Sequence, residues 1–257
     1  MAKAAELLDG GADAPAMGAD LFAVARTLDD AHSLRRALTE PVVPAEAKRR
    51  LLRSLFEGQV GEPALEVADA GVGVRWSGVR DLPDALEQAS VAAYVAQADR
   101  DGHLDDLEDD LFRFSRIVEG NAALRDALSD GTVSWEGKRR LVHDLVGDKV
   151  VPATASLLEQ AVSGRHRSLT PVLALYQKVA ADRRDSMMAT VWVARPLAEE
   201  QRERLARALS AQQGRPIHLN VVVDPGVLGG VRVAVGEEVL DSSVATRLRQ
   251  AHRRLER

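Results

Sequence analysis

The residues of this chain that could hold a phosphate group lie in a glycine-rich segment, DPGVLGGVRVAVGEEVLDSS, at residues 224–243. A phosphate-binding loop needs Gly-x-x-x-x-Gly-Lys-Ser/Thr, and a dinucleotide fingerprint needs Gly-x-Gly-x-x-Gly between a strand and a helix. The glycine pair here is followed by Arg232 and by an alternating valine run, so neither pattern is met. The segment does not predict nucleotide chemistry.

The same segment is explained by turns. Asp224, Pro225 and Gly226 are typical of a turn, and Gly229 and Gly230 permit a positive φ or a bulge where the next strand begins. A further glycine at 236 allows that strand to turn back on residues 239–240. We therefore expect a folded hairpin in place of a phosphate site.

A second candidate site, QADRDGHLDDLE at residues 97–108, has spacing close to that of an EF-hand calcium loop. Asp99, Asp101, Gly102 and Glu108 fall at loop positions three, five, six and twelve, but position one is Gln97, which removes an anionic ligand. A turn between two helices is the favoured explanation of the stretch, with the acidic residues after Gly102 at the positive end of the next helix. Calcium binding remains an alternative.

No other pattern indicates chemistry. The chain has no cysteine, its six histidines form no metal-binding or triad-like pair, and there is no Gly-x-Ser-x-Gly elbow. The net charge of −5 argues against a general nucleic-acid binder, and no segment has the apolar length of a signal peptide or a membrane span. We expect no catalytic residue, no cofactor and no metal, with membrane association only through a partner.

Most of the chain is an internal repeat with an offset of 90 residues. SLRRAL at 33–38 matches ALRDAL at 123–128, and AEAKRRLLRSL at 45–55 matches WEGKRRLVHDL at 135–145. From residue 20 to residue 75, 18 of 56 positions are identical without a gap, against roughly 4 or 5 expected by chance, which indicates duplicated structure. Each copy has helical periodicity, and residues 82–100 read as one helix shared by both. Copy two should break near Gly120 and Asn121 and begin its next helix at a Ser134 cap, and the Lys-Arg-Arg run of each copy should be a solvated helix face, with contact with an acidic partner as the alternative. The expected core of copy one consists of Leu21, Leu28, Leu34, Leu38, Leu51 and Leu55.

The period changes to that of strands beyond Met188. Residues 190–195, 217–223 and 231–235 alternate like strands, while residues 197–213 and 243–255 read as helices. The predicted fold class is mostly α: two duplicated helical bundles at 1–87 and 88–188, followed by a small α/β domain at 189–257 with the order β-α-β-β-α. A catalytically empty chain of this kind is typical of a protein that holds others together.

The end of the sequence resembles a known family. The run DPGVLGGVRVAVGEEVLDSSVATRL resembles the C-terminal signature of the delta subunit of F-type ATP synthase, the OSCP/delta family, with Asp224, Pro225, Gly229, Gly230, Asp241 and Ser243 at the motif positions. The resemblance covers roughly residues 88–255, and RPLAEEQRERLARAL at 195–209 and the helical copy at 123–145 share it. Ser242 departs from the usual glycine. The extra residues 1–87 resemble the long forms in which the helical domain is doubled.

This resemblance implies a stator protein of a hetero-oligomeric complex at the cytoplasmic face of the bacterial cell membrane. Such subunits link the alpha/beta catalytic head to the b subunit of the peripheral stalk, so that proton-driven rotation is coupled to ATP synthesis. The helical domain grips N-terminal segments of alpha subunits in a groove between its first and fifth helices. Here that groove falls on Val91, Tyr94, Val95, Leu157, Leu158 and Val162.

The C-terminal domain of the family binds the b subunit, and the predicted contact is one face of the last helix, formed by Val244, Leu248, Ala251 and Leu255. These residues can equally pack inward on the sheet. Because residues 3–9 make only a short first helix, copy one is expected to bind alpha poorly, against the alternative of two equivalent alpha sites. An adaptor of an unrelated complex is the other alternative to the stator.

Overall fold

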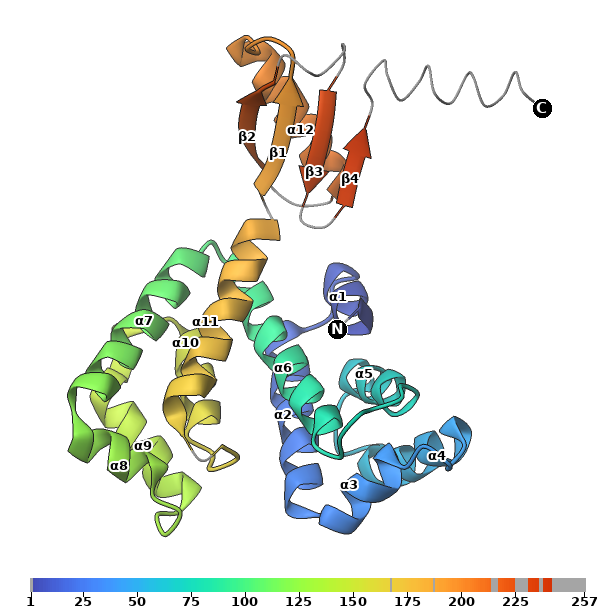
Figure 1. Ribbon diagram of the computed structural model, residues 1–257. Helices are drawn as coiled ribbons and strands as arrows, with labels where there is room; N and C mark the ends of the chain where they lie inside the picture. The colour runs from blue at the N-terminus through green and yellow to red at the C-terminus, as the bar shows by residue number, and fades with distance from the viewer. Residues whose placement is uncertain are drawn as a thin grey trace. The chain divides into compact units, whose positions relative to one another are not determined.

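The chain folds into two compact units, as Figure 1 shows. The computed structural model describes residues 2–166, 168–186, 188–213, 217–224, 231–235 and 238–241. Unit one spans Met1–Ala181 and is helical, whereas unit two spans Asp182–Arg257 and contains a sheet. Within the described ranges, no helix combines the length and the apolar character needed to cross a bilayer.

The helices of unit one are short and follow each other through tight turns. In chain order they are α1 (Ala2–Asp9), α2 (Ala14–Asp30), α3 (His32–Thr39), α4 (Ala45–Phe56), α5 (Glu62–Val72), α6 (Asp81–Arg100), α7 (Leu104–Gly120), α8 (Ala122–Ser129), α9 (Trp135–Val146), the 3-10 helix η1 (Gly147–Lys149), α10 (Pro152–Ala161) and α11 (Leu169–Ser186). The predicted cap at Ser134 is confirmed, since its hydroxyl accepts a hydrogen bond from the backbone N–H of Gly137. The predicted break is also confirmed, because Asn121 caps α8.

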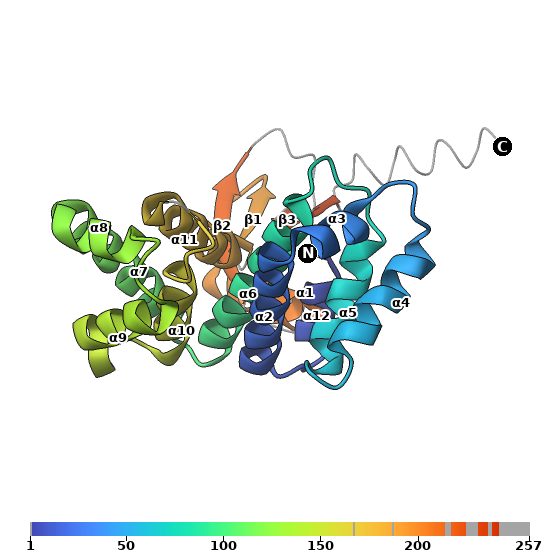
Figure 2. The same cartoon turned by 90° about the horizontal axis from the view of Figure 1, so that it is seen from below.

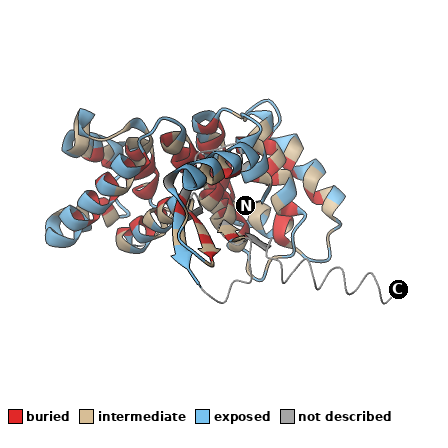
Figure 3. Ribbon diagram, turned by 90° about the horizontal axis from the view of Figure 1, so that it is seen from above, coloured by how far each residue is buried: buried red, intermediate tan, exposed pale blue. Residues whose placement is uncertain are grey.

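Helix α6 is the predicted shared helix, and it is continuous from Asp81 to Arg100. Twelve of its 20 residues are buried, so the helix is covered around most of its circumference (Figure 3). It packs against α1, α2 and α5 from copy one and against α7 and α10 from copy two. Helix α6 therefore contributes to the cores of both copies at once.

Equivalent hydrogen bonds in the two copies explain why the Asp-Leu-Phe sequence recurs. The Asp20 carboxylate accepts from the backbone N–H of Gly61 at 2.7 Å, and Gly61 is the N-cap of α5. Ninety residues later, Asp110 accepts from the backbone N–H of Val151 at 3.2 Å, and Val151 is the N-cap of α10. Each aspartate thus satisfies a free N–H at a helix start from a neighbouring helix. The repeat in sequence is a repeat in tertiary structure.

The repeated Lys-Arg-Arg run is only in part the solvated face expected of a charge run, since Arg50, Arg139 and Arg140 are exposed. The lysines at 48 and 138 are both buried. Arg139 binds Glu159 on α10 at 2.8 Å, while Arg49 donates to the backbone oxygen of Asp69 on α5 at 3.4 Å. The arginines therefore connect the fourth and fifth helices of each copy.

The buried face of α4 differs from the one expected from the leucine spacing. Residues 48, 52 and 56 face the core, with Leu52 fully buried, whereas Leu51 and Leu55 are 37% and 39% exposed. The buried residues are four apart, one helical turn, and the exposed leucines lie one residue round the helix. Of the other leucines predicted for the core of copy one, Leu21, Leu28 and Leu38 are fully buried, while Leu34 is partly buried and packs against them.

Unit two is a four-stranded sheet in the order β2-β1-β3-β4, with one described helix. Its elements are β1 (Met188–Val193), α12 (Glu199–Gln213), β2 (His218–Val223), β3 (Val231–Val235) and β4 (Glu238–Asp241). β1 pairs with β2 in parallel and with β3 antiparallel, and β3 pairs with β4 antiparallel. Residues 243–255, predicted as a helix, lie outside the described residues.

The predicted hairpin is confirmed for β3 and β4, which pair as Val235↔Glu238 on either side of residues 236–237. It is wrong for the segment that begins at Asp224, because β2 and β3 are not neighbours in the sheet. Helix α12 returns the chain parallel to β1, and β3 then adds to the opposite edge of β1. β2 and β3 therefore lie on opposite sides of β1.

Because α6 belongs to both cores, the two copies should unfold together. Leu86 on α6 is 2% exposed, and we expect Leu86→Ala to lower the stability of unit one by about 2–5 kcal/mol through the cavity it leaves. Denaturant unfolding of the full chain, followed by hydrogen exchange of both copies, measures this. Equal loss of protection in α4 and α9 is the expected result. Loss confined to copy one would contradict the shared core.

Candidate partner-binding site

The six residues predicted to line a partner groove lie together but are not exposed. They come from α6 and α10, which pack against each other. In relative exposure Tyr94 reaches 7%, and each of the others is at most 1% exposed, namely Val91, Val95, Leu157, Leu158 and Val162. A partner cannot contact these side chains on the folded chain, apart from the edge of Tyr94. The groove as predicted is therefore closed, and its assignment to a partner stays a prediction.

Helix α2 of copy one covers the predicted groove. Gly18 on α2 lies against the Tyr94 ring so tightly that an added Cβ would stand 2.8 Å from its Cε2 atom. The Ser90 hydroxyl donates to the backbone oxygen of Gly18 at 2.6 Å and lies 3.2 Å from the Gln160 side-chain oxygen on α10. Farther along, the Arg26 guanidinium stacks over Trp135 at 3.9 Å from the ring centre. Copy one is thus docked on copy two through one helix.

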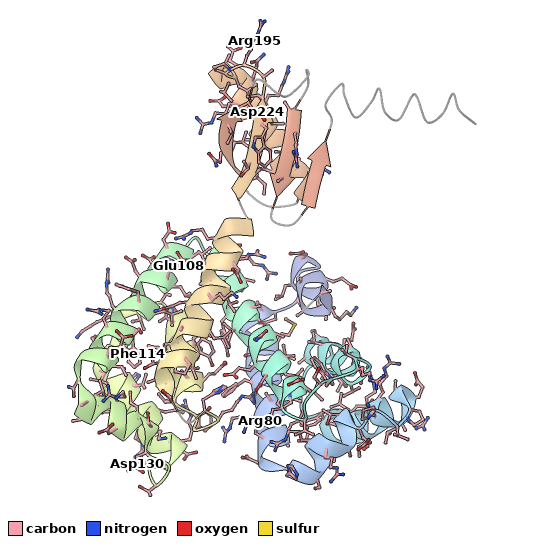
Figure 4. All side chains as sticks on the ribbon, in the orientation of Figure 1. Arg80, Glu108, Phe114, Asp130, Arg195 and Asp224 are labelled. Carbon is pink, nitrogen blue, oxygen red and sulfur yellow. The ribbon has the colours of Figure 1, made fainter. Side chains whose placement is uncertain are left out.

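The repeat shows that α2 is built for this contact. At the three positions of α7 that match Gly18, Ala19 and Ala23, copy two has Glu108, Asp109 and Arg113. Small residues let helix backbones approach closely, whereas charged side chains require solvent. The outward surface of α7, where Figure 4 labels Glu108, has the charged residues, and α2 has the small ones.

An aromatic residue that occurs in both copies also differs in exposure between them. Phe22 on α2 is 5% exposed, but its repeat partner Phe112 on α7 is 59% exposed. The small residues on α2, set against the charged residues at the matching positions of α7, could have revealed this contact from the sequence. This difference distinguishes a helix that docks on a second copy from one that faces solvent.

Two pockets remain on the surface beside this contact. Figure 2 labels α2, α6 and α10, whose residues line both of them. One, of about 200 Å³, is lined at one end by residues that include Pro15 of α2, Pro152 of α10 and Asp101. The other, of about 230 Å³, is lined by residues of α2, α9 and α10 that include Arg26, Trp135 and Glu159. Both are lined by Tyr94 and Ser156, so they adjoin where α2 faces α10, and we call the pair the inter-copy furrow.

At the opposite end of α2, an ionic cluster joins the two copies. Arg165, in the loop between α10 and α11, has a side chain that is 1% exposed and that bonds to Asp29 of α2 and to Asp84 and Glu87 of α6. The Arg165–Glu87 distance is 2.8 Å, and the backbone oxygen of Arg165 also accepts from Arg80, labelled in Figure 4. Sequence reasoning did not find this cluster, because its members are far apart in the chain.

Glu87 is the buried centre of that cluster. It binds His166 at 2.7 Å and accepts a hydrogen bond from the Tyr176 hydroxyl at 2.8 Å. Burial alone would raise its pKa, but the His166 hydrogen bond, Arg165 and Tyr176 together hold the pKa of Glu87 below its ordinary value of 4.5. Burial, with the Glu87 carboxylate nearby, raises the pKa of Tyr176 well above 10.0. The carboxylate is therefore ionised in the folded protein at neutral pH.

The residues predicted to contact a b subunit, Val244, Leu248, Ala251 and Leu255, lie outside the described residues, as do Pro225, Gly229, Gly230 and Ser243 of the motif. Two motif residues are described. The backbone N–H of Asp224 donates to the oxygen of Val193 at 2.8 Å, where β1 and β2 end, and Figure 4 labels Asp224 there. Asp241 ends β4 opposite Arg232. Both aspartates thus have positions in the sheet framework.

The sheet of unit two has one covered face. Its core consists of residues on the α12 side, among them Val191, Leu209 and Val233. On the alternate positions, Trp192 stacks with Arg232 at 5.2 Å, and Val222 is 37% exposed. No described element covers this second face.

The loop predicted as an alternative calcium site is a tight turn between α6 and α7. Gly102 has a φ of 76°, and the Gln97 amide donates to the carboxylate of Asp101. His103 pairs with Asp106 at 2.8 Å. Over the described residues, no group of three histidine or acidic side chains is arranged to hold a metal ion.

Comparison with known proteins gives one consistent result. The family model described as "ATP synthase delta (OSCP) subunit" matches residues 91–255. The chain is 46% identical over 240 residues to the ATP synthase subunit delta of Nocardioides sp., covering 93% of this chain and 87% of that protein. It is 46% identical to the one from Kineococcus radiotolerans, with 95% and 89% covered, and 47% identical to the one from Streptomyces avermitilis, with 92% and 87% covered.

These similarities extend beyond the family model. The model begins at residue 91, but the three relatives match at least 92% of the chain and so include most of copy one. A chain in the Toxoplasma gondii mitochondrial ATP synthase hexamer is also similar, with a TM-score of 0.34 at 23% identity, covering 65% of this chain and 97% of that one. That score is too low to carry a structural argument.

The close approach of Gly18 to Tyr94 predicts the result of a small substitution. Gly18→Ala should destabilise unit one by about 1–3 kcal/mol, because the added methyl group overlaps the ring. Tyr94→Ala in the same chain should relieve most of that cost, which a double-mutant cycle of unfolding free energies measures. Gly120→Ala is the control, since its Cβ would meet nothing within 4 Å. Additive effects of the two substitutions would contradict the packing described.

The ionic cluster predicts a pH dependence. Because the pKa of Glu87 is lowered in the folded state, the stability it contributes is present above its unfolded pKa, near 4.5, and is lost as the pH falls through its folded pKa. Glu87→Gln should therefore lower the Tm at neutral pH, and the difference from wild type should shrink as the pH falls below 4.5. Thermal melts across this range test it, with the exposed Glu57→Gln as control. A difference that does not change with pH would contradict the assignment.

Proposed function

Because the chain belongs to the ATP synthase delta (OSCP) subunit family, we propose that it works as a non-catalytic stator subunit, connecting the alpha/beta catalytic head to the b subunit of the peripheral stalk. Such a link keeps the head from turning with the rotor, so that proton-driven rotation is coupled to ATP synthesis. The observation that carries the proposal is identity of 46–47% along nearly the whole chain to proteins named ATP synthase subunit delta.

The absence of phosphate-loop sequences is consistent with a structural role. Neither nucleotide-binding pattern occurs in the sequence, and the aspartate that begins the glycine-rich motif supports the strand framework of unit two. The cytoplasmic face of the cell membrane is the proposed location, reached through the other subunits of the complex.

The contact with the head is proposed for unit one. The predicted partner is an N-terminal segment of an alpha subunit, bound as a helix in a groove of copy two. What supports this is the seam between α2, α6 and α10, which leaves a furrow open beside Tyr94. An unrelated adaptor would have no reason to share sequence with delta subunits over both copies.

The contact with the stalk is proposed for unit two. Only one side of the sheet is covered by a described helix, and a small domain with an uncovered apolar face is typical of a docking module. The contact residues we propose are Val244, Leu248, Ala251 and Leu255, which share one face of a predicted helix. The alternative is that this face packs on the sheet of the same chain.

A charge on the predicted helix face distinguishes these two roles. We expect Leu248→Asp to weaken co-purification of the b subunit strongly while unit two stays folded, since a buried apolar contact is lost at the partner surface. Gln250→Asp, two positions along and on the other side of the predicted helix, should leave co-purification unchanged. Circular dichroism and pull-down from the assembled complex measure both.

The competing outcomes are clear. If Leu248→Asp unfolds unit two, the face packs inward and the b-subunit contact must lie elsewhere. If a folded variant keeps the b subunit fully, the predicted contact is wrong. If no ATP synthase subunit co-purifies with the wild-type chain, the stator role itself is contradicted.

A further inference from the structure

We infer that the inter-copy furrow is a composite binding site, in which α2 of copy one and α10 of copy two hold a single partner helix over Tyr94. The inference rests on the proposed contact with an alpha-subunit segment and changes where that segment lies. It places the segment beside α2, in a site to which both copies contribute, instead of on the bare faces of α6 and α10.

The first step is that the α6 face is not available. Val91 and Val95 are fully buried, and α2 cannot leave them without breaking copy one, because Leu21 and Leu28 of α2 are themselves fully buried in that core. The contact also includes the Ser90–Gly18 hydrogen bond and the stacking of Arg26 over Trp135 in copy two. Helix α2 is therefore a fixed wall of the site and does not act as a removable plug.

The second step is that the furrow has the dimensions of a short helix. It follows α2 from Pro15 to Arg26 and α10 from Pro152 to Gln160, with Tyr94 between them. Eleven residues of helix extend over about 16 Å, or three turns. A segment of that length would reach from Pro15 to Arg26 along α2. Its floor and walls include Pro15, Ala19, Phe22, Tyr94 and Trp135, which suit an apolar face.

The third step is the charge at the two ends. The end near α7 has the carboxylate of Asp101, which is exposed and bonded by the Gln97 amide. The other end has Arg26 and Arg139, with Glu159 paired to Arg139. The complementary partner is an amphipathic helix with small or aliphatic residues over Tyr94, a basic residue at the Asp101 end and an acidic residue at the Arg26 end.

The fourth step is that copy one offers no equivalent site. The positions that match Tyr94 and Trp135 are Ala4 and Ala45, so the aromatic floor is missing. The position that matches Ser156 is Glu66, which forms an ion pair with Lys3 at 3.1 Å. The repeat therefore supplies a matched control within the same molecule.

Isothermal titration of the full chain with a synthetic peptide of the alpha-subunit N-terminus from the same organism tests the inference. We expect one site per chain. Ser156→Trp, which fills the furrow where its two pockets meet, should weaken binding by about tenfold or more, as for a central contact of an interface. Glu66→Trp at the matching position of copy one should leave the affinity unchanged.

A crosslinking arm keeps the test independent of folding. A photoreactive residue in place of Ala19, which is exposed on α2, should crosslink to the peptide, while the same residue in place of Asp109, its repeat partner on α7, should not. Crosslinking at position 19 supports the furrow even if Ser156→Trp fails to fold.

The remaining outcomes overturn the inference. Unchanged affinity of a folded Ser156→Trp chain, or no crosslink at position 19, places the bound peptide elsewhere and leaves the stator function standing. A loss confined to Glu66→Trp, or two equal sites, moves the contact to copy one. A wild-type chain that does not bind the peptide contradicts the alpha contact of the proposed function itself.

Discussion

The structure of unit one depends on a single helix, α6, which packs against helices of both copies and leaves no exposed linker between them. With 12 of its 20 residues buried, α6 completes the core of copy one and begins the core of copy two. A duplicated bundle would ordinarily join its copies through a linker that leaves their orientation free. A shared helix fixes the relative orientation of the two copies, because each core packs on a different side of that helix. The extra copy is therefore a rigid extension of the second one.

Duplication also created a surface that had to be changed. If copy one retained the charged residues that α7 has at positions 108, 109 and 113, its second helix would bring unpaired charges against Tyr94. Gly18, Ala19 and Ala23 remove them, and the Tyr94 ring fills the space that a Cβ at residue 18 would need. The two copies keep the equivalent hydrogen bonds of Asp20 and Asp110 but differ on the face where they meet. That difference closes one groove and leaves the inter-copy furrow beside it.

The Arg165 cluster fixes the other end of the same contact. Three carboxylates meet one buried guanidinium there, with additional arginines at Asp29. A buried ion pair is weak support for net stability, because desolvation opposes it, but removing one partner leaves an uncompensated charge. The cluster thus acts mainly to specify one arrangement of α2, α6 and the α10–α11 loop. Apolar packing supplies the stability, and the ions select the geometry.

By itself the sequence determined the repeat, the shared helix at 82–100, the break near Gly120 and Asn121, the cap at Ser134, and the change to an α/β unit after Met188, because each follows from local sequence patterns or from a fixed offset. It also indicated the family, through a motif that is contiguous in the chain. Tertiary structure alone decided which face of α4 is buried, that β2 and β3 lie on opposite sides of β1, and that the groove residues Val91 and Leu158 are inaccessible. The last of these depends on contacts between segments about 70 or more residues apart, such as Gly18 with Ser90 and Asp29 with Arg165. No local sequence pattern encodes these contacts, because the sequence of a helix face is the same whether solvent or a second copy covers that face.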